Sequence, residues 1–488
     1  MADATHDAVV IVPGIMGSAL KETATGRLLW GLQGTAWLKA WTRGDGLLPL
    51  HLDEDERAGR YGRITPAGLL RFPAWAPVLK GFEPYSRLVQ AVRGKVVHPA
   101  AVLEFAYDWR LPVEHNGRLL AEAAHRHLTA WRTHDAHTAA RDVYGDGRPA
   151  RLVFICHSMG GLVTRAAFAH ATASGSSLDA DTRAVITLGT PFHGSAKTTV
   201  ILNGNRSDPL PVLPPGRMQA LAATLPGVHD LLPGYRCIDA GMDGHHLTAA
   251  DVEAIGGDRD LAQVALDFQH RMRSVALPGH RAVAGVAQPT VQTIRIDAGI
   301  VHEQYEAFET NRDGELARHR ATGIPIRRNR AGDGTVYRDM ATVPGAIETG
   351  MALQHGALAK GSDALAYIRT VLTEYDKDRG PALGPGGIGL ELPDSADAGK
   401  PWWLRIHPAP DETLDTYAGL SCTLHDAESD RLLATPRLGW HDGTVAARIT
   451  LPAPGLYRVR VDTGGPAAVT QLVLATHPDL AHDDSHNT

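Results

Sequence analysis

The stretch RLVFICHSMGGLVTRAAF, residues 151–168, decides the fold. Its first five residues are mostly apolar and predict a buried strand, and the pattern that follows Met159 is typical of a helix. The turn between them, Cys156-His157-Ser158-Met159-Gly160, is very short and contains a serine. We therefore expect a strand that passes abruptly into a helix, with Ser158 at the turn.

This turn has the form G-x-S-x-G, apart from its first position. In that motif the serine adopts a strained conformation that pushes its hydroxyl out above the edge of the sheet. Cys156 replaces the first glycine and is small enough for the strand and the helix to approach each other. Ser158 is therefore the candidate nucleophile. The alternative is an ordinary strand–turn–helix with an incidental serine.

A serine hydroxyl is a poor nucleophile near neutral pH, so it needs a base and an acid that orients the base. In folds with this kind of turn the acid and then the histidine follow the serine along the chain. Asp333 lies in a Gly-Asp-Gly turn within RAGDGTVYRD (330–339), and His355 lies within LQHGALAK (353–360). This order predicts a catalytic triad of Ser158, Asp333 and His355.

Other histidines are weaker candidates for the base. His157 adjoins the serine, but on a strand its side chain is expected to point away from it. The remaining weaker candidates are His193, His302 and the pair His245-His246. Adjacent side chains such as those of the pair diverge, and no carboxylate or cysteine spacing supports them as ligands. We expect no metal site and no cofactor.

The negative charge that develops on an ester oxygen needs two backbone N–H donors, each typically contributing a factor of about 10²–10³ in rate. Met159, directly after the nucleophile, is expected to supply one donor. The other comes from the loop after an early strand, which VVIVPGIMGS (9–18) provides. We predict Ile15 as this second donor, with Met16 as its alternative. The other interpretation of the segment is a glycine-rich turn without a ligand.

Apolar strands alternate with helical patterns through the first 375 residues, which predicts an α/β fold with a parallel sheet covered on both faces. The expected strands are 8–12, 102–107, 151–155, 183–188 and 280–286. Helical patterns occupy 117–134, the segment after Met159, and 362–372. Proline-rich turns and short polar helices interrupt the alternation at about 197–280, which predicts a cap or lid insertion.

Beyond the helical pattern at 362–372 the sequence period changes to two. Alternating segments between Pro, Gly and Asp turns predict a small β-sandwich, immunoglobulin-like in form. These segments are 402–408, 445–451, 455–462 and 470–476. The expected domains are a catalytic domain at 1–380, a linker at 381–387, the sandwich at 388–476 and a disordered tail at 477–488. We suggest that the sandwich docks a protein partner.

The bulk composition excludes several classes of protein. The net charge is −6 and no Lys/Arg cluster is present, so no nucleic-acid partner is indicated. No stretch approaches the roughly 18 apolar residues of a membrane-spanning helix, and the first residues lack the basic start of a signal peptide. The three cysteines are too few and too scattered for a disulfide framework. We expect a cytoplasmic protein that contacts membranes only peripherally.

Four tryptophans near the start of the chain are candidates for lipid contact: Trp30, Trp37, Trp41 and Trp75. Trp37 and Trp41 are one helical turn apart and so share a face of a helix. Tryptophan suits a membrane–water boundary because its ring is apolar and its N–H is polar. The alternative is that these rings line the acyl pocket or the core, as aromatic side chains commonly do.

Seven segments, in order, resemble the lecithin:cholesterol acyltransferase family, which also contains lysosomal phospholipase and the phospholipid:diacylglycerol acyltransferases. They are VPGIMGSAL (12–20), YDWRLP (107–112), CHSMGGLV (156–163), LGTPFHGSAK (188–197), LPGVHDLLP (225–233), GDGTV (332–336) and QHGALAK (354–360). The resemblance covers about residues 8–373 and implies an α/β-hydrolase fold with the same triad and with Ile15 and Met159 at the oxyanion hole. It implies a structural role for Asp108 and Arg110, as an ion pair that braces the site.

The resemblance implies acyl-ester chemistry on lipids. We expect a serine hydrolase of the lipase or phospholipase type, acting through an acyl-enzyme on Ser158. One alternative is an O-acyltransferase that moves the acyl group to an alcohol, and another is a non-catalytic scaffold whose β-domain binds a partner. Secreted members of the family carry a signal peptide and a disulfide near an amino-terminal lipid-binding segment, and this sequence shows neither. The β-type domain after residue 387 lies outside the family pattern.

Overall fold

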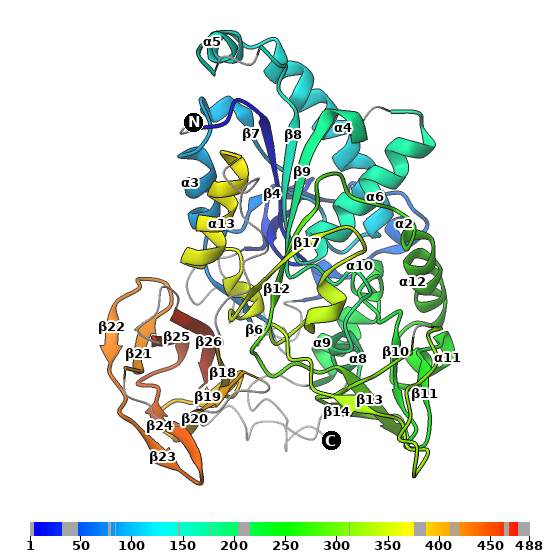
Figure 1. Cartoon of the computed structure of the whole chain (residues 1–488), viewed down its shortest axis with the longest axis vertical. Coiled ribbons are helices and arrows are strands. Elements are labelled where there is room, and N and C mark those ends of the chain that lie inside the picture. The colour runs from blue at the N-terminus through cyan, green and yellow to red at the C-terminus, as the bar shows by residue number, and fades with distance from the viewer. Residues whose placement is uncertain are drawn as a thin grey trace.

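A six-stranded parallel sheet forms the centre of the computed structural model (Figure 1). The structure describes residues 4–31, 47–76, 80–82, 84–144, 147–176, 178–203, 215–311, 313–374, 387–409, 414, 419–462 and 468–476. The sheet has the order β17-β12-β9-β8-β1-β7. Its strands are β1 (Ala8–Val12), β7 (Val102–Glu104), β8 (Leu152–His157), β9 (Thr182–Leu188), β12 (Arg281–Gly285) and β17 (Ile347–Met351).

Helices cover both faces of this sheet, which explains why its middle strands are apolar along their whole length. Helices α3 (Ser86–Arg93) and α13 (Ser362–Leu372) lie on one side, and α4 (Val113–Arg132) and α6 (Met159–Ala173) lie on the other (Figure 1). All six residues of β8 are buried. Two further helices are α5 (Asp135–Tyr144) and α7 (Leu178–Asp181). The predicted α/β class is confirmed.

A second, four-stranded sheet has the order β11-β10-β13-β14. Strands β10 (Arg236–Asp239) and β11 (Gly244–His246) lie within the predicted insertion at about 197–280, whereas β13 (Thr293–Asp297) and β14 (Ile300–Gln304) follow it in the chain. The helices within the predicted insertion are α8 (Lys197–Leu202), α9 (Pro215–Ala222), α10 (Pro226–His229), α11 (Ala249–Ala254) and α12 (Arg259–Met272).

Smaller elements complete the first 375 residues. Three strands form one small sheet and two form another: β2 (Ser18–Glu22), β3 (Leu28–Trp30) and β4 (Ile64–Leu69), then β5 (Ala74–Ala76) and β6 (Lys80–Phe82). The rest are η1 (Leu48–Leu50), α2 (Glu54–Arg57), η2 (Pro99–Ala101), β15 (Ala307–Phe308), β16 (Arg327–Arg328), η3 (Arg338–Ala341) and η4 (His355–Ala357). Among the described residues, no helix combines the length and the apolar character that crossing a bilayer requires.

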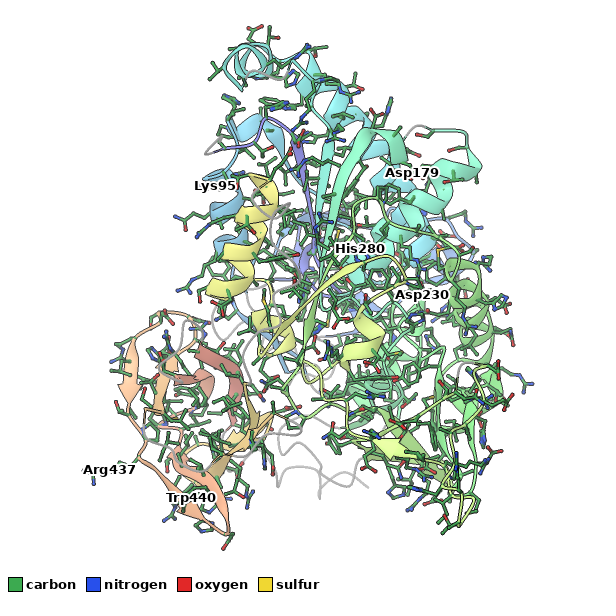
Figure 2. All side chains as sticks on the ribbon, viewed as in Figure 1. Lys95, Asp179, Asp230, His280, Arg437 and Trp440 are labelled. Carbon is green, nitrogen blue, oxygen red and sulfur yellow. The ribbon has the colours of Figure 1, made fainter. Side chains whose placement is uncertain are left out.

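The C-terminal part consists of two β-sheets that share one apolar core. One sheet contains β18 (Ile388–Glu391), β20 (Pro401–Pro408), β24 (Thr444–Thr450) and β23 (Leu438–His441). The other contains β19 (Ser395–Asp397), β26 (Ala468–Thr476), β25 (Gly455–Asp462), β21 (Ser421–Asp426) and β22 (Leu432–Ala434). Alternate residues of both sheets, such as Leu404 and Val459, point into the shared core. Trp440 marks the outer edge of this part in Figure 2.

The predicted linker and tail fall mostly outside the described residues. Of the linker at 381–387 only Gly387 is described, and the tail at 477–488 is not described. The domain boundaries therefore stay predictions.

Candidate active site

Ser158 occupies the turn between β8 and α6 in a strained backbone conformation, with φ +52° and ψ −128°. A positive φ is unfavourable for a residue with a Cβ, so the surrounding structure must hold it in place. The Ser158 N–H donates to Leu188 O at 2.9 Å, and Thr190 Oγ1 donates to Ser158 O at 2.9 Å. Cys156, which replaces the usual glycine, is fully buried and its sulfur lies 3.1 Å from Thr164 Oγ1.

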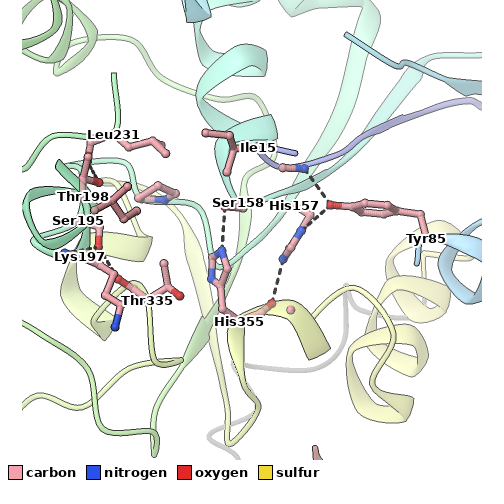
Figure 3. Close-up of a pocket in the computed structure, with 14 residues that line it drawn as sticks. Ile15, Tyr85, His157, Ser158, Ser195, Lys197, Thr198, Leu231, Thr335 and His355 are labelled. Atoms are coloured by element: carbon pink, nitrogen blue, oxygen red, sulfur yellow. Dashed lines mark hydrogen bonds between the residues drawn. The ribbon is translucent and has the colours of Figure 1, made fainter. Parts of the chain in front are cut away.

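The structure brings Ser158, His355 and Asp333 into one hydrogen-bonded row. Figure 3 shows the part of this row between Ser158 and His355. Ser158 Oγ lies 2.8 Å from His355 Nε2, and His355 Nδ1 lies 2.7 Å from Asp333 Oδ2. The other carboxylate oxygen, Oδ1, accepts from Thr335 N at 2.9 Å and Val336 N at 2.7 Å. Asp333 is fully buried, so these donors replace the water that its carboxylate gives up.

A backbone hydrogen bond also connects Asp333 to His355. The His355 N–H donates to Asp333 O at 2.8 Å, which ties the two loops together. Gly189, with φ +59°, lies beside both of them at the end of β9. A Cβ at Gly189 would approach Asp333 Oδ2 to 2.6 Å, so only glycine leaves room for the carboxylate and the imidazole.

Of the residues predicted for the oxyanion hole, Ile15 lies at the cavity that also contains Ser158. Ile15 lines the cavity together with Ser158 and His355, whereas Met16 does not. In the described residues the Ile15 N–H has no protein acceptor, and Met159, as the first residue of α6, has no partner within the helix. Ile15 is thus better placed than Met16, although the donor roles of Ile15 and Met159 stay predictions.

The YDWR segment holds the loop that carries Ile15. Tyr107 OH donates to Pro13 O at 2.8 Å, and Trp109 Nε1 donates to Ser18 O at 3.2 Å. The two aromatic residues of this segment therefore hold the two ends of the proposed oxyanion loop, Pro13 and Ser18, in place. Sequence reasoning did not assign them this role.

Asp108 and Arg110 form the expected ion pair, with Arg110 Nη2 2.7 Å from Asp108 Oδ2. Glu56 joins the pair at 2.7 Å and makes a buried cluster of three charges. Burial raises the pKa of Asp108, and the guanidinium of Arg110 opposes that shift. The cluster touches neither Ser158 nor His355 within the described contacts, which agrees with a structural role.

His157 lies beside the candidate site, where its hydrogen-bond partners are Tyr85 and the carbonyl of His355 and not Ser158. Its ring centroid lies 5.1 Å from that of His355, and it lines the same cavity. Burial, followed by the charge of His355, lowers the pKa of His157 to about 3, so this imidazole is neutral.

Tyr85 connects His157 to the oxyanion loop (Figure 3). Tyr85 OH accepts from the Gly14 N–H at 2.9 Å and lies 2.7 Å from His157 Nδ1. His157 Nε2 lies 2.9 Å from His355 O, a carbonyl that can only accept. Nε2 must therefore carry the proton of the neutral ring, and Nδ1 must accept from Tyr85. Nothing in the sequence near Tyr85 signalled this role.

The other weaker candidates for the base lie elsewhere. Burial lowers the pKa of His193 to about 4, and His302 is paired with Asp297 at 3.6 Å on the surface. His245 and His246 are exposed on β11. The described part of the chain holds no cluster of three or more His, Cys, Asp or Glu side chains suited to a metal ion.

Trp30 is the one predicted lipid-contact side chain that the structure describes, and it is not at the surface. It is 4% exposed, donates from Nε1 to Met16 O at 2.7 Å and packs edge-on against Trp109. The core interpretation therefore holds for Trp30, because its N–H satisfies a buried carbonyl of the oxyanion loop. Trp37 and Trp41 lie outside the described residues, as does the side chain of Trp75.

The cavity above Ser158 combines apolar and polar walls. Its apolar side chains are Ile15, Pro191, Ile201 and Leu231, and its polar ones include Ser195, Lys197, Thr198 and Thr335 (Figure 3). Ser195 Oγ donates to Thr335 O, which joins the start of the insertion to the loop of Asp333.

A parallel sheet that carries a strained serine turn, followed in sequence by an acid and a histidine, defines the class of α/β-hydrolases. Residues 78–313 match the model of the family described as lecithin:cholesterol acyltransferase. The resemblance seen in the sequence is thus confirmed over these residues, which are similar to that family. The matched range includes Ser158 and Met159, whereas Ile15, Asp333 and His355 lie outside it.

Solved structures similar to the chain include a chain of the Tle4–Tli4 complex, with 15% identity, a TM-score of 0.42, and 75% of this chain and 98% of that chain covered. The lipase BlEst2 of Bacillus licheniformis is similar in its propeptide form, with 13% identity, a TM-score of 0.31 and 97% and 74% covered. Its mature form has 15% identity, a TM-score of 0.28 and 76% and 92% covered. Such TM-scores are too low to support a statement about activity. No curated protein matches the chain in sequence.

Proposed function

We propose that this protein is a serine hydrolase that cleaves carboxylic esters of lipids through an acyl-enzyme on Ser158. The observation that carries the proposal is the row from Ser158 Oγ through His355 to Asp333, with steps of 2.8 and 2.7 Å. These are the distances at which a base can take a hydroxyl proton. The family match supports a lipid ester as the substrate.

In this proposal His355 Nε2 takes the Ser158 proton as Oγ attacks the ester carbonyl carbon. Asp333 holds the imidazole in the required tautomer and stabilises the imidazolium that forms. The carbonyl oxygen, now negative, accepts from the N–H groups of Ile15 and Met159. The imidazolium then gives its proton to the leaving alcohol, and the acyl group stays on Ser158. Water, deprotonated by His355, releases the acid and restores the serine.

The cavity walls suggest how an ester would lie. Ile15, Ile201 and Leu231 offer apolar surface to an acyl chain, and the polar side chains of the insertion face the same space. This division suits a substrate with an apolar tail and a polar head, as lipids have. A cytoplasmic location with peripheral contact at a membrane remains our prediction.

Transfer of the acyl group to an alcohol is the second candidate, and the family's description as an acyltransferase favours it. Both reactions share the acyl-enzyme and differ only in whether water or an alcohol resolves it. Incubation of liposomes with and without a long-chain alcohol separates the two, because hydrolysis yields free acid and transfer yields a new ester.

The test of the proposed function is a lipid analysis of liposomes treated with the wild type and with Ser158→Ala. We expect free fatty acid or new ester from the wild type, and a loss on the order of 10⁶ in rate for the variant. Product formation by a clean preparation of Ser158→Ala would overturn the nucleophile assignment. Absence of any product from the wild type would favour the non-catalytic scaffold.

A further inference from the structure

Three buried glutamines meet where the C-terminal sheets contact the hydrolase part. Gln354 Nε2 lies 3.0 Å from Gln288 Oε1 and 2.9 Å from Gln471 Oε1. All three side chains are at most 5% exposed. An amide nitrogen has two protons, so both donors of Gln354 are used, one within the hydrolase part and one toward β26. Gln354 directly precedes His355.

The side chain of Gln288 forms hydrogen bonds to the edge strand β18 of the C-terminal sheet that does not contain β26. Its Nε2 donates to Ile388 O at 2.8 Å, and its Oε1 accepts from Leu390 N at 3.0 Å. Strand β18 is the edge of its sheet, so these two backbone groups have no neighbouring strand on that side. The amide of Gln288 takes the place of that neighbour. Unpaired edge groups of this kind must otherwise be covered or solvated.

The same glutamine reaches the loop of the catalytic acid through its backbone. Gln288 N donates to Gly332 O at 2.9 Å, and Gly332 N donates to Gln288 O at 3.1 Å. Gly332 directly precedes Asp333. On the other side of the carboxylate, a Cβ at Gly334 would approach Gln354 Oε1 to 2.7 Å. The residues flanking Asp333 and His355 are thus held by the amides that hold the C-terminal sheets.

Apolar contacts reinforce this junction. Leu472 and Leu474 of β26, with Leu456 of β25, belong to the apolar core of the hydrolase part. The backbones of the two parts also lie close together at Gly389, where an added Cβ would come within 2.5 Å of Ala287 O. The C-terminal sheets are therefore packed against the loops that carry Asp333 and His355, and the linker is not their sole connection to the hydrolase part.

We propose that the C-terminal β-domain is a positioning element of the catalytic site. It holds His355 through Gln471 and Gln354, and it holds Asp333 through β18, Gln288 and Gly332. None of the three glutamines touches the reacting atoms, so their effect is on the geometry of the acid and the base. This inference rests on the proposed serine mechanism, and it gives the β-domain a role within its own chain.

The test substitutes Gln471→Met in the full chain, which keeps the size of the side chain and removes its acceptor. Gln354 then has one buried donor without a partner, and the His355 loop loses its tie to β26. Val473→Ala is the matched control, because Val473 is buried on the same strand in the sandwich core. Gln471→Glu is the rescue, since its carboxyl, kept protonated by burial, retains an acceptor oxygen and replaces Nε2, which has no partner in the described structure.

With a soluble p-nitrophenyl ester we expect kcat of Gln471→Met to fall about tenfold, because small displacements of catalytic groups are costly in rate. The Michaelis constant KM should stay unchanged, and the rate of labelling by a fluorophosphonate should fall by the same factor. Val473→Ala should lower the melting temperature without changing kcat, and Gln471→Glu should recover kcat to within about threefold of the wild type. Wild-type kcat in Gln471→Met, or an equal fall in Val473→Ala, would overturn the inference.

A wild type that is neither active nor labelled would instead refute the proposed function. In that event the far-downfield proton NMR signal of the His355–Asp333 hydrogen bond still decides about positioning. A shift or loss of that signal in Gln471→Met, with no change in Val473→Ala, supports the inference. Identical signals in both variants and the wild type contradict it.

Discussion

The proposed nucleophile and the proposed acid–base pair are built in different ways. Ser158 and the proposed oxyanion loop follow two adjacent strands of the sheet, β8 and β1. A strained turn and close backbone packing place them, and the side chains of Tyr107 and Trp109 hold the loop. Asp333 and His355 lie on loops near the β17 edge of the sheet, and side chains from distant parts of the chain hold them. We call these the nucleophile side and the acid–base side.

This difference predicts how substitutions on each side affect folding and the rate of the reaction. On the nucleophile side, close packing at Gly160 leaves no room for added atoms, so substitutions there should disturb folding and rate together. On the acid–base side, side-chain hydrogen bonds through Gln288, Gln354 and Gln471 add to the backbone contacts, so substitutions in that network should lower the rate more than the stability. Tyr85 and His157 join the two sides, because they link Gly14 to the carbonyl of His355.

After Ser158→Ala, the largest effect is expected on the acid–base side, from Asp333→Asn. An asparagine can keep the contacts to Thr335 N and Val336 N, but it presents an NH₂ group to His355 Nδ1 and favours the wrong tautomer. We expect kcat to fall by about 10⁴ with little change in melting temperature. Asp339→Asn, an exposed change in the next helical turn, is the control and should be neutral. A fall of less than about tenfold in Asp333→Asn would remove Asp333 from the triad.

Gly160→Ala tests the nucleophile side. The added Cβ would come within 2.5 Å of Val12 O and Pro13 O, so the backbone that leads to Ile15 must move. We expect a loss of about 1–3 kcal/mol in the free energy of unfolding and a fall in kcat of up to about 100-fold. Denaturant unfolding and ester kinetics measure the two. Gly439→Ala, where nothing lies within 4 Å of the new Cβ, should change neither. A stable, fully active Gly160→Ala would contradict the tight fit.

Tyr85→Phe removes the hydroxyl that connects the nucleophile side to the acid–base side. It leaves the Gly14 N–H and His157 Nδ1 without their partner, which should cost about 1–3 kcal/mol of stability and about tenfold in kcat. Tyr457→Phe is a matched control, because the Tyr457 hydroxyl donates to Ala453 O within the C-terminal sheets. The control should lose stability only. Equal effects on kcat in both variants would show that Tyr85 has no special connection to the site.

The smallest effect concerns acid stability. Burial holds the pKa of His157 at about 3 and that of His280 at about 4, below the ordinary 6.5. The stability from such neutral histidines is complete above pH 6.5 and is lost as the pH falls. Burial also raises the pKa of Asp230 to about 7, and this carboxyl acts in the opposite direction, losing stability as the pH rises from 3.8 to 7. Figure 2 shows Asp230 and His280 within the hydrolase part.

His193, with a pKa of about 4, acts in the same direction, so three histidines oppose one carboxyl and the stability falls between pH 6 and 4. Asp230→Asn removes the opposing carboxyl, so we expect a steeper loss per pH unit in the variant. Denaturant unfolding across this range measures both slopes. Equal slopes in the wild type and the variant would show that Asp230 is not titrating as its burial implies.

The sequence predicted the nucleophile side well because its signals are local. The strand at 8–12 and the helix at 362–372 match β1 and α13, and the serine turn lies where the motif placed it. The acid and base positions came from their order along the chain, and the structure brings them together with Ser158. The sequence missed β17, whose first two residues are not buried and show no apolar run.

What holds the acid and the base could not be predicted, because it depends on contacts between distant residues. Tyr85 and His157 are 72 residues apart, and Gln354 and Gln471 are 117 apart. No local pattern distinguishes such residues from others of their type. The change of period after residue 375 indicated a separate β-domain, yet periodicity carries no information about what its faces touch. The prediction that this domain docks a protein partner stays a prediction.

The triad is tested most directly by mapping a fluorophosphonate adduct with peptide mass spectrometry in the wild type, Ser158→Ala and His355→Ala. We expect one adduct in the wild type, on the peptide that contains Ser158, with no adduct in Ser158→Ala and far slower formation in His355→Ala. An adduct on a different residue, or none on the folded wild type, would contradict the account.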